Sequence, residues 1–225
     1  MELVSIFLSG VAQCLLALVI AALFWAGHRG VARLRRRPGE GFGKWCGLRL
    51  PGRGLGELIL LVLAGAVVGA GVTAAFWFLV PGYADLFSGE HSPAVRFLGL
   101  GSPALFFLAA LVHGVLGTGF WEELLFRGVL ARRLMSWLGV VPGNILQALL
   151  FTAMHNGLVA LTMPAAGLGL HACTVAVVLP LALFSGWYNE RRGGGSIVGS
   201  WILHGSLNFF TVLTVAALLG SSAAG

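Results

Sequence analysis

Two adjacent glutamates and a nearby arginine are the first residues in this chain that could carry chemistry. Glu122 and Glu123 occur in FWEELLFRG, and Arg127 follows Glu123 by four residues. Residues i and i+4 share a face of an α-helix, so we expect Glu123 and Arg127 to pair. Glu122 projects about 100° away from Glu123 and is free to act on something else, such as a proton of water. A purely structural anchor at a helix end would leave Glu122 unexplained.

Two histidines and an asparagine extend this set. His155 lies in FTAMHNG, and His204 and Asn208 are four residues apart in WILHGSLNFF. A helical His and Asn on one face can donate hydrogen bonds toward a single point. Interhelical hydrogen bonding would explain each of them separately. Together with Glu122 they supply a base, a group that orients water and two oxyanion donors, which is what hydrolysis of an acyl bond by activated water requires.

Two other chemistries use the same residues. Glu122, His155 and His204 form an oxygen and nitrogen ligand set for zinc, with a fourth position left for water. The chain lacks the HExxH spacing and any cysteine ligand motif, however. Ser206 is a candidate nucleophile, but on a helix it faces away from its neighbours His204 and Asn208. The sequence leaves open whether a carboxylate alone or a bound metal activates the water.

The composition predicts that these polar residues lie in a membrane. Hydrophobic residues make up 58% of the 225 residues and charged residues 10%, with a mean hydropathy of +0.92. Because a helix needs about 20 residues to cross the hydrocarbon, the length allows about six spans. We therefore predict an all-α fold, a polytopic transmembrane helix bundle with the catalytic residues inside it. The expected spans are about Val4–Gly27, Leu58–Val80, Pro103–Leu134, Pro142–Thr162, Leu168–Tyr188 and Ser196–Leu219.

The third expected span is too long for one simple crossing. Glycines around Gly119 permit a kink or a close helix crossing there, so we expect a span up to about this point that then continues or bends into EELLFRGVLARRL. Pro180 should interrupt the fifth span. We expect Arg127 near the cytoplasmic surface, with the site shallow in that leaflet. Nine residues separate His113 from Glu122, which puts them on opposite faces of a continuous α-helix, and His113 is left out of the site.

The net charge of +6 indicates topology rather than nucleic-acid binding. Eight of the 14 Lys and Arg residues lie between Arg29 and Arg53, and only Arg96 lies in a loop of the opposite parity. Basic residues gathered in alternate short loops are typical of cytoplasmic retention, so we expect both termini on the other side. The three cysteines are far apart and suggest neither a disulfide framework nor a zinc knuckle.

The motifs resemble those of a known family. EELLFR fits EExxxR, FTAMH fits FxxxH and HGSLN fits HxxxN, in this order and within Gly117 to Phe210. The chain therefore resembles the CPBP family, the CAAX and bacteriocin-processing intramembrane proteases also known as Abi proteins. The stretch LALFSGWYNERRGGGSIVGSWILHGSLN is also similar to the family's segment before the last motif.

The resemblance implies a role for each motif residue. Glu122 would be the base that activates water, and His155 would help to hold that water. His204 and Asn208 would form the oxyanion site. The resemblance favours a route without a metal cofactor, with zinc bound by Glu122, His155 and His204 as the alternative.

The resemblance also implies an organisation and a setting. Glu123 and Arg127 would fix helix geometry rather than perform chemistry. Residues 1–96 would form a variable membrane region with two spans and a basic cytoplasmic loop, and residues 97–225 the protease core. The expected partners are the lipid bilayer and a membrane protein or peptide substrate, in a prokaryotic cell membrane, for protein processing, sorting or bacteriocin-type maturation or immunity. A non-catalytic scaffold and a proton-coupled transporter are the alternatives, and no feature indicates an oligomeric state.

Overall fold

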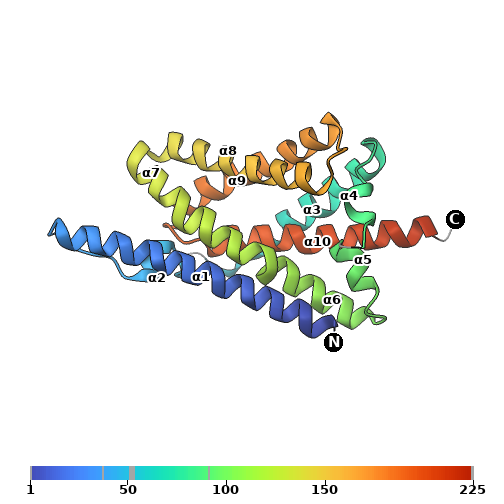
Figure 1. The fold of residues 1–225 in the computed structure, drawn as a ribbon, viewed down its shortest axis with the longest axis horizontal. Helices are drawn as coiled ribbons and strands as arrows, with labels where there is room; N and C mark the ends of the chain where they lie inside the picture. The colour runs from blue at the N-terminus through green and yellow to red at the C-terminus, as the bar shows by residue number, and fades with distance from the viewer. Residues whose placement is uncertain (1, 37, 51–53, 91, 224–225) are drawn as a thin grey trace.

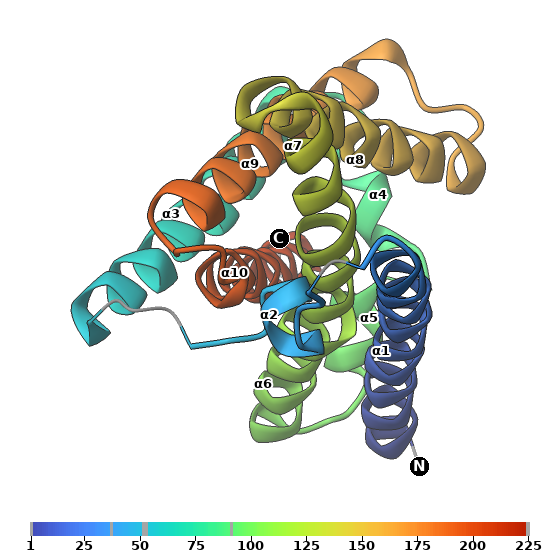
Figure 2. The same cartoon turned by 90° about the vertical axis from the view of Figure 1, so that its left-hand side faces the viewer.

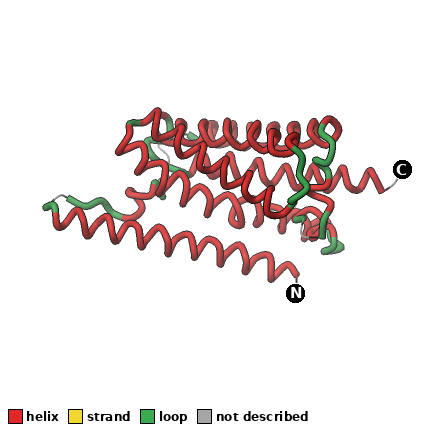
Figure 3. The backbone as a smooth tube through the Cα atoms, turned by 45° about the horizontal axis from the view of Figure 1, so that its top comes forward, coloured by secondary structure: helices red, strands yellow, loops and turns green. Residues whose placement is uncertain are grey.

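The computed structural model describes residues 2–36, 38–50, 54–90 and 92–223, so Arg37 and Arg53 of the basic loop lie outside the described residues. These residues form helices and loops with no β-strand, as Figure 3 shows. Six helices in the described part are long and apolar enough to cross a membrane. The expected all-α membrane bundle is confirmed. The spans are Glu2–Leu34, Leu55–Leu79, Pro103–Leu138, Val140–Thr162, Leu168–Arg191 and Val198–Ser221.

Five of these spans are single α-helices. They are α1 (Glu2–Leu34), α3 (Leu55–Leu79), α8 (Val140–Thr162), α9 (Leu168–Arg191) and α10 (Val198–Ala223). The expected interruption at Pro180 is wrong, because α9 continues through this residue. Short helices lie in the connections: α2 (Phe42–Cys46), α4 (Asp85–Ser88) and α5 (Pro93–Leu98).

The third span is one continuous helical rod of 36 residues. In Figure 1 it runs unbroken from α6 to α7, so of the two alternatives at Gly119 the helix continues and does not bend. Two π-helical segments, in which hydrogen bonds run from i to i+5, interrupt its α-helical geometry. The rod consists of α6 (Pro103–Val112), η1 (His113–Phe120), η2 (Glu123–Ala131) and α7 (Arg132–Leu138).

The glycines of the third span permit a close helix crossing instead of a bend. A Cβ at Gly114 would lie 2.9 Å from the carbonyl oxygen of Gly205 on α10, and one at Gly119 would lie 3.3 Å from the Cα of Gly205. Small residues of this kind let two backbones approach in membrane bundles. The crossing brings η1 and the start of η2 against the part of α10 that carries His204.

Helix α10 is the centre of the bundle. Figure 2 shows it nearly end-on, with α3, α9, the third span and α5 around it. Glycines again set the distance to α3, because a Cβ at Gly65 would lie 2.7 Å from the Leu203 carbonyl oxygen and one at Gly69 would collide with the Leu207 carbonyl oxygen. Residues of α10 are therefore enclosed from several sides, and His204 is only 4% exposed.

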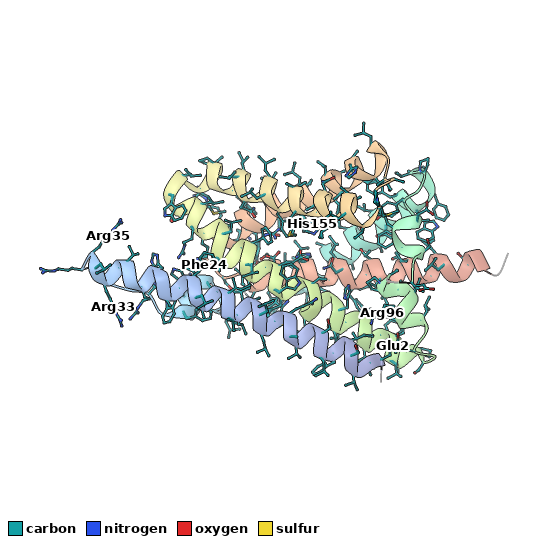
Figure 4. The ribbon with its side chains drawn as sticks, viewed as in Figure 1. Glu2, Phe24, Arg33, Arg35, Arg96 and His155 are labelled. Atoms are coloured by element: carbon teal, nitrogen blue, oxygen red, sulfur yellow. The ribbon has the colours of Figure 1, made fainter. Side chains whose placement is uncertain are left out.

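The two ends of the bundle differ in charge. Both termini lie at one end, together with Arg96 and Glu2, whereas Arg33 and Arg35 lie at the other (Figures 1 and 4). At this basic end the loop is docked on the bundle: the Arg133 guanidinium lies 4.4 Å from the ring centre of Trp45, which is 1% exposed. The Ile197 amide donates to the Gly47 carbonyl oxygen at 3.0 Å. These contacts hold the first turn of α10 in place, ahead of His204 and Asn208 on the same helix.

Candidate active site

A cavity of about 220 Å³ lies inside the bundle, and all four residues expected to be catalytic line it. Figure 4 shows one of them, His155 on α8, about midway between the two ends of the bundle. The walls of this cavity come from the third span, α8, α10 and the connection that contains α4 and leads into α5. The lining residues are Phe87, Ser92, Pro93, Ala94, His113, Thr118, Glu122, His155, His204, Asn208, Thr211, Val212 and Val215.

The Glu122 carboxylate faces both histidines. Its Oε2 atom lies 3.6 Å from His155 Nε2 and 3.9 Å from His204 Nε2. Glu122 is 7% exposed, and Oε2 has no hydrogen-bond partner among the described residues. A buried carboxylate oxygen without a partner is costly, so its position calls for a bound group. The separations suit a water oxygen at about 2.8 Å from each atom of a pair.

Each imidazole is held through its other nitrogen. His155 Nδ1 lies 2.9 Å from the Phe151 carbonyl oxygen, and His204 Nδ1 lies 3.1 Å from Glu123 Oε1. A carbonyl oxygen and an ionised carboxylate only accept hydrogen bonds, so both Nδ1 atoms carry the proton. In the neutral form each Nε2 then presents a lone pair toward Glu122.

Glu123 holds the His204 ring in place and pairs with Arg127. Its side chain has no exposed surface, and Oε1 lies 3.3 Å from Arg127 Nη1, as the spacing predicted. Ser200 donates a hydrogen bond of 2.5 Å to Oε2, and Asn189 donates one of 2.8 Å to Ser200. Sequence reasoning missed Ser200, although it precedes His204 by four residues and therefore shares its face of α10.

Arg127 is enclosed within the bundle and is 1% exposed. Its expected position near the cytoplasmic membrane surface stays a prediction. Arg127 lies eleven residues before the end of α7 at Leu138, which is about 16 Å along a helix. Its guanidinium carbon lies 4.0 Å from the ring centre of Phe151, the first residue of FTAMH. The same ring lies 4.4 Å from the His155 ring, so Phe151 packs between the ion pair and the site.

Asn208 is oriented by a threonine of the third span. Its Nδ2 donates a hydrogen bond of 2.7 Å to Thr118 Oγ1, and that hydroxyl donates in turn to the His113 carbonyl oxygen at 3.2 Å. An amide nitrogen carries two hydrogens, which leaves one for the cavity. Thr118 precedes Glu122 by four residues, a spacing that could have revealed it.

The expected position of His113 is wrong, because this residue lines the same cavity as Glu122. Nine residues span about two and a half turns of α-helix but closer to two turns of the wider π-helix. Residues 113 to 120 adopt that π-helical form. Ser206, in contrast, donates to the Ile202 carbonyl oxygen of its own helix and does not line the cavity.

The residues as placed do not fit a bound zinc ion. Zinc with bonds of about 2.0–2.1 Å holds tetrahedral ligand atoms about 3.3 Å apart, less than the 3.6 and 3.9 Å measured from Glu122. Within the described ranges no group of three His, Cys, Asp or Glu side chains is arranged to hold a metal.

Comparison with known proteins identifies the segment that contains this site. Residues 103–210, or 108 of the 225 residues, match the family model described as type II CAAX prenyl endopeptidase Rce1-like. This segment, slightly under half of the chain, is similar to the Rce1-like family. The expected kinship with the CPBP and CAAX proteases is thereby confirmed, and it implies a membrane-embedded hydrolase of peptide bonds. No curated protein and no solved structure showed a significant match to the chain.

The buried ion pair of the Rce1-like segment makes a specific prediction about stability. Replacing Arg127 with methionine leaves Glu123 buried without its partner and should lower the free energy of unfolding by about 3–5 kcal/mol. The measurement is unfolding of the purified protein in mixed micelles with increasing SDS.

Lys44→Met is the matched control. Lys44 and Glu40 are also four residues apart and 3.4 Å from each other, but their side chains are 64% and 43% exposed. Loss of an exposed pair should change stability by about 0–1 kcal/mol. Equal effects of the two substitutions would contradict the anchoring role of Arg127.

Proposed function

We propose that this protein is an intramembrane endopeptidase in which Glu122 activates the attacking water. The observation that carries the proposal is the buried, unpartnered Oε2 of Glu122, which faces the Nε2 atoms of His155 and His204 at 3.6 and 3.9 Å. The Glu122 carboxylate and the His155 Nε2 atom, on two sides of one water oxygen, can accept both of its protons. The lone pairs of the water then remain free to attack a peptide carbonyl carbon.

The first step forms the bond between water and the substrate. Glu122 takes one proton while the water oxygen bonds to the carbonyl carbon, and the carbonyl π electrons move onto its oxygen. His155 accepts a hydrogen bond from the second proton of the water and fixes its position. The product of this step is a tetrahedral intermediate with one negative oxygen, which needs donors already in place.

His204 and Asn208 supply these donors. Asn208 offers the hydrogen that Thr118 does not use. His204 Nε2 can act as the second donor when that nitrogen carries a proton, and it then faces the developing oxyanion.

The second step breaks the peptide bond. Glu122 returns the proton to the amide nitrogen, the electron pair on the oxygen re-forms the carbonyl, and the C–N bond electrons leave with the nitrogen. The products are a new carboxyl group and an amine, and one water is consumed. Glu123 and Arg127 take no part in these transfers and hold His204 in its orientation.

The cavities suggest that the substrate arrives from the bilayer. An apolar cavity of about 480 Å³ lies between α3 and α9, and it shares Val72 and Leu207 with a second cavity of about 180 Å³. This second cavity shares Phe87 and Asn208 with the catalytic one. An apolar route that ends at Asn208, the proposed oxyanion donor, suits a membrane-anchored protein or peptide substrate. This agrees with the description of the matching family model, type II CAAX prenyl endopeptidase Rce1-like.

The central prediction concerns Glu122→Gln, which keeps the shape of the side chain but removes the base. The rate of cleavage should fall by about 10²–10⁴, the usual contribution of a general base. The assay uses the protein in liposomes with internally quenched apolar peptide reporters. Glu90→Gln, at an exposed position outside the cavity, is the control and should cleave normally. Equal rates for both variants would remove Glu122 from the chemistry and favour a scaffold.

Asn208→Ala tests the oxyanion site separately. Loss of one preorganised donor should lower kcat by about 10²–10³ with little change in KM, because the donor acts mainly on the transition state. Ser206→Ala, on the same helix but outside the cavity, should leave kcat unchanged. A change confined to KM would make Asn208 a binding residue instead.

The absence of a metal requirement is a prediction of its own. Because the spacing around Glu122 exceeds that of a zinc site, dialysis against a strong chelator should leave the cleavage rate unchanged. Metal content measured on the same sample by mass spectrometry provides the control. Loss of activity that returns with added Zn²⁺ would establish the metal-dependent alternative.

A further inference from the structure

A separate cavity of about 290 Å³, lined mainly by polar groups, lies on the side of the third span away from α3. It is enclosed by α1, α5 and η1. One wall is a row of polar residues on α1, and the opposite wall carries a histidine and an arginine. The lining residues are Ser5, Ile6, Ser9, Gly10, Gln13, Pro93, Arg96, Phe97, His113 and Gly117.

The polar row on α1 has no structural explanation within the bundle. Ser5, Ser9 and Gln13 follow one another at intervals of four residues and therefore share one face of an otherwise apolar helix. All three are exposed rather than packed. Polar groups facing hydrocarbon without partners cost several kcal/mol each, so this face needs a polar environment.

The polar cavity adjoins the catalytic one at His113 and Pro93, which line both. Among the described residues, neither ring nitrogen of His113 has a hydrogen-bond partner. A Cβ at Gly117 would lie 3.5 Å from His113 Nδ1 and 3.7 Å from Gln13 Oε1. The absence of a side chain at Gly117 thus leaves a gap between these two polar groups.

We propose that this polar cavity is a hydrated passage that supplies the catalytic water from the end of the bundle that carries Glu2 and Arg96. The inference rests on the proposed function, because hydrolysis consumes one water per bond and the surrounding hydrocarbon excludes water. The substrate would enter through the apolar cavities between α3 and α9. Water would enter along the polar side chains of Ser5, Ser9 and Gln13. His113 marks the junction between the passage and the active site.

Cysteine labelling tests the passage without any need for catalysis. In a background with Cys14, Cys46 and Cys173 replaced by alanine, Ser9→Cys is compared with Leu8→Cys at almost the same depth on the lipid-facing side. Gln13→Cys is compared with Leu15→Cys, which is 57% exposed and projects about 200° away from Gln13 on α1. The probe is a charged methanethiosulfonate added to vesicles of either orientation. It reacts with thiolates, which form in water and not in hydrocarbon.

We expect Ser9→Cys and Gln13→Cys to react at least about tenfold faster than their neighbours, and only when the probe is on the side of Glu2 and Arg96. Equal rates within each pair, or labelling only from the basic end, would overturn the passage. Labelling should be the same in a Glu122→Gln background. Normal labelling combined with unimpaired cleavage by Glu122→Gln would reject the proposed function and leave the passage standing.

A second variant tests whether the passage reaches the site. His113→Cys should be labelled from the same side, and Gly117→Leu should suppress that labelling by filling the gap. Gly71→Leu, where an added side chain meets nothing within 4 Å, is the control and should have no effect. Undiminished labelling of His113→Cys in the presence of Gly117→Leu would show that water reaches the site by another route.

Discussion

The Glu123 carboxylate is fully buried, and both of its oxygens are engaged by groups on other turns: Arg127 and His204 at Oε1 and Ser200 at Oε2. A charge in this position is tolerable only because each partner is in place, since removal of one leaves the others uncompensated. The same contacts fix the tautomer and the direction of His204. The stability of the bundle and the geometry of the site therefore depend on one interaction, made by the residue next to Glu122.

The α-helical period predicted much of the site from the sequence. Spacings of four residues correctly paired Glu123 with Arg127 and placed His204 and Asn208 on one cavity. Apolar runs correctly predicted the six spans of the described chain, because length and hydrophobicity alone define a membrane helix. The position of His155 opposite Glu122 depends on how α8 packs against the third span, and only the motif resemblance linked the two.

One error has its physical origin in the geometry of the third span. Its glycines allowed either a kink or a close helix crossing, and they serve the close crossing with α10, where the helix widens into π geometry instead of breaking. Counting at 3.6 residues per turn assigned His113 to the wrong face, although the four-residue spacing between Thr118 and Glu122 could have revealed Thr118. Pairing with Glu123 and stacking on Phe151 permit the burial of Arg127 among the helices.

The π-helical segments have a further consequence for how this site can change. A wide π turn completes one rotation with about one more residue than an α-helical turn, so it takes up an extra residue without rotating the helices on either side. Deleting a single residue between positions 113 and 120 would therefore return that turn to α-helical geometry and leave α6 nearly in phase with Glu122. The same deletion within the α-helical part of the rod would instead rotate one half against the other by about 100°.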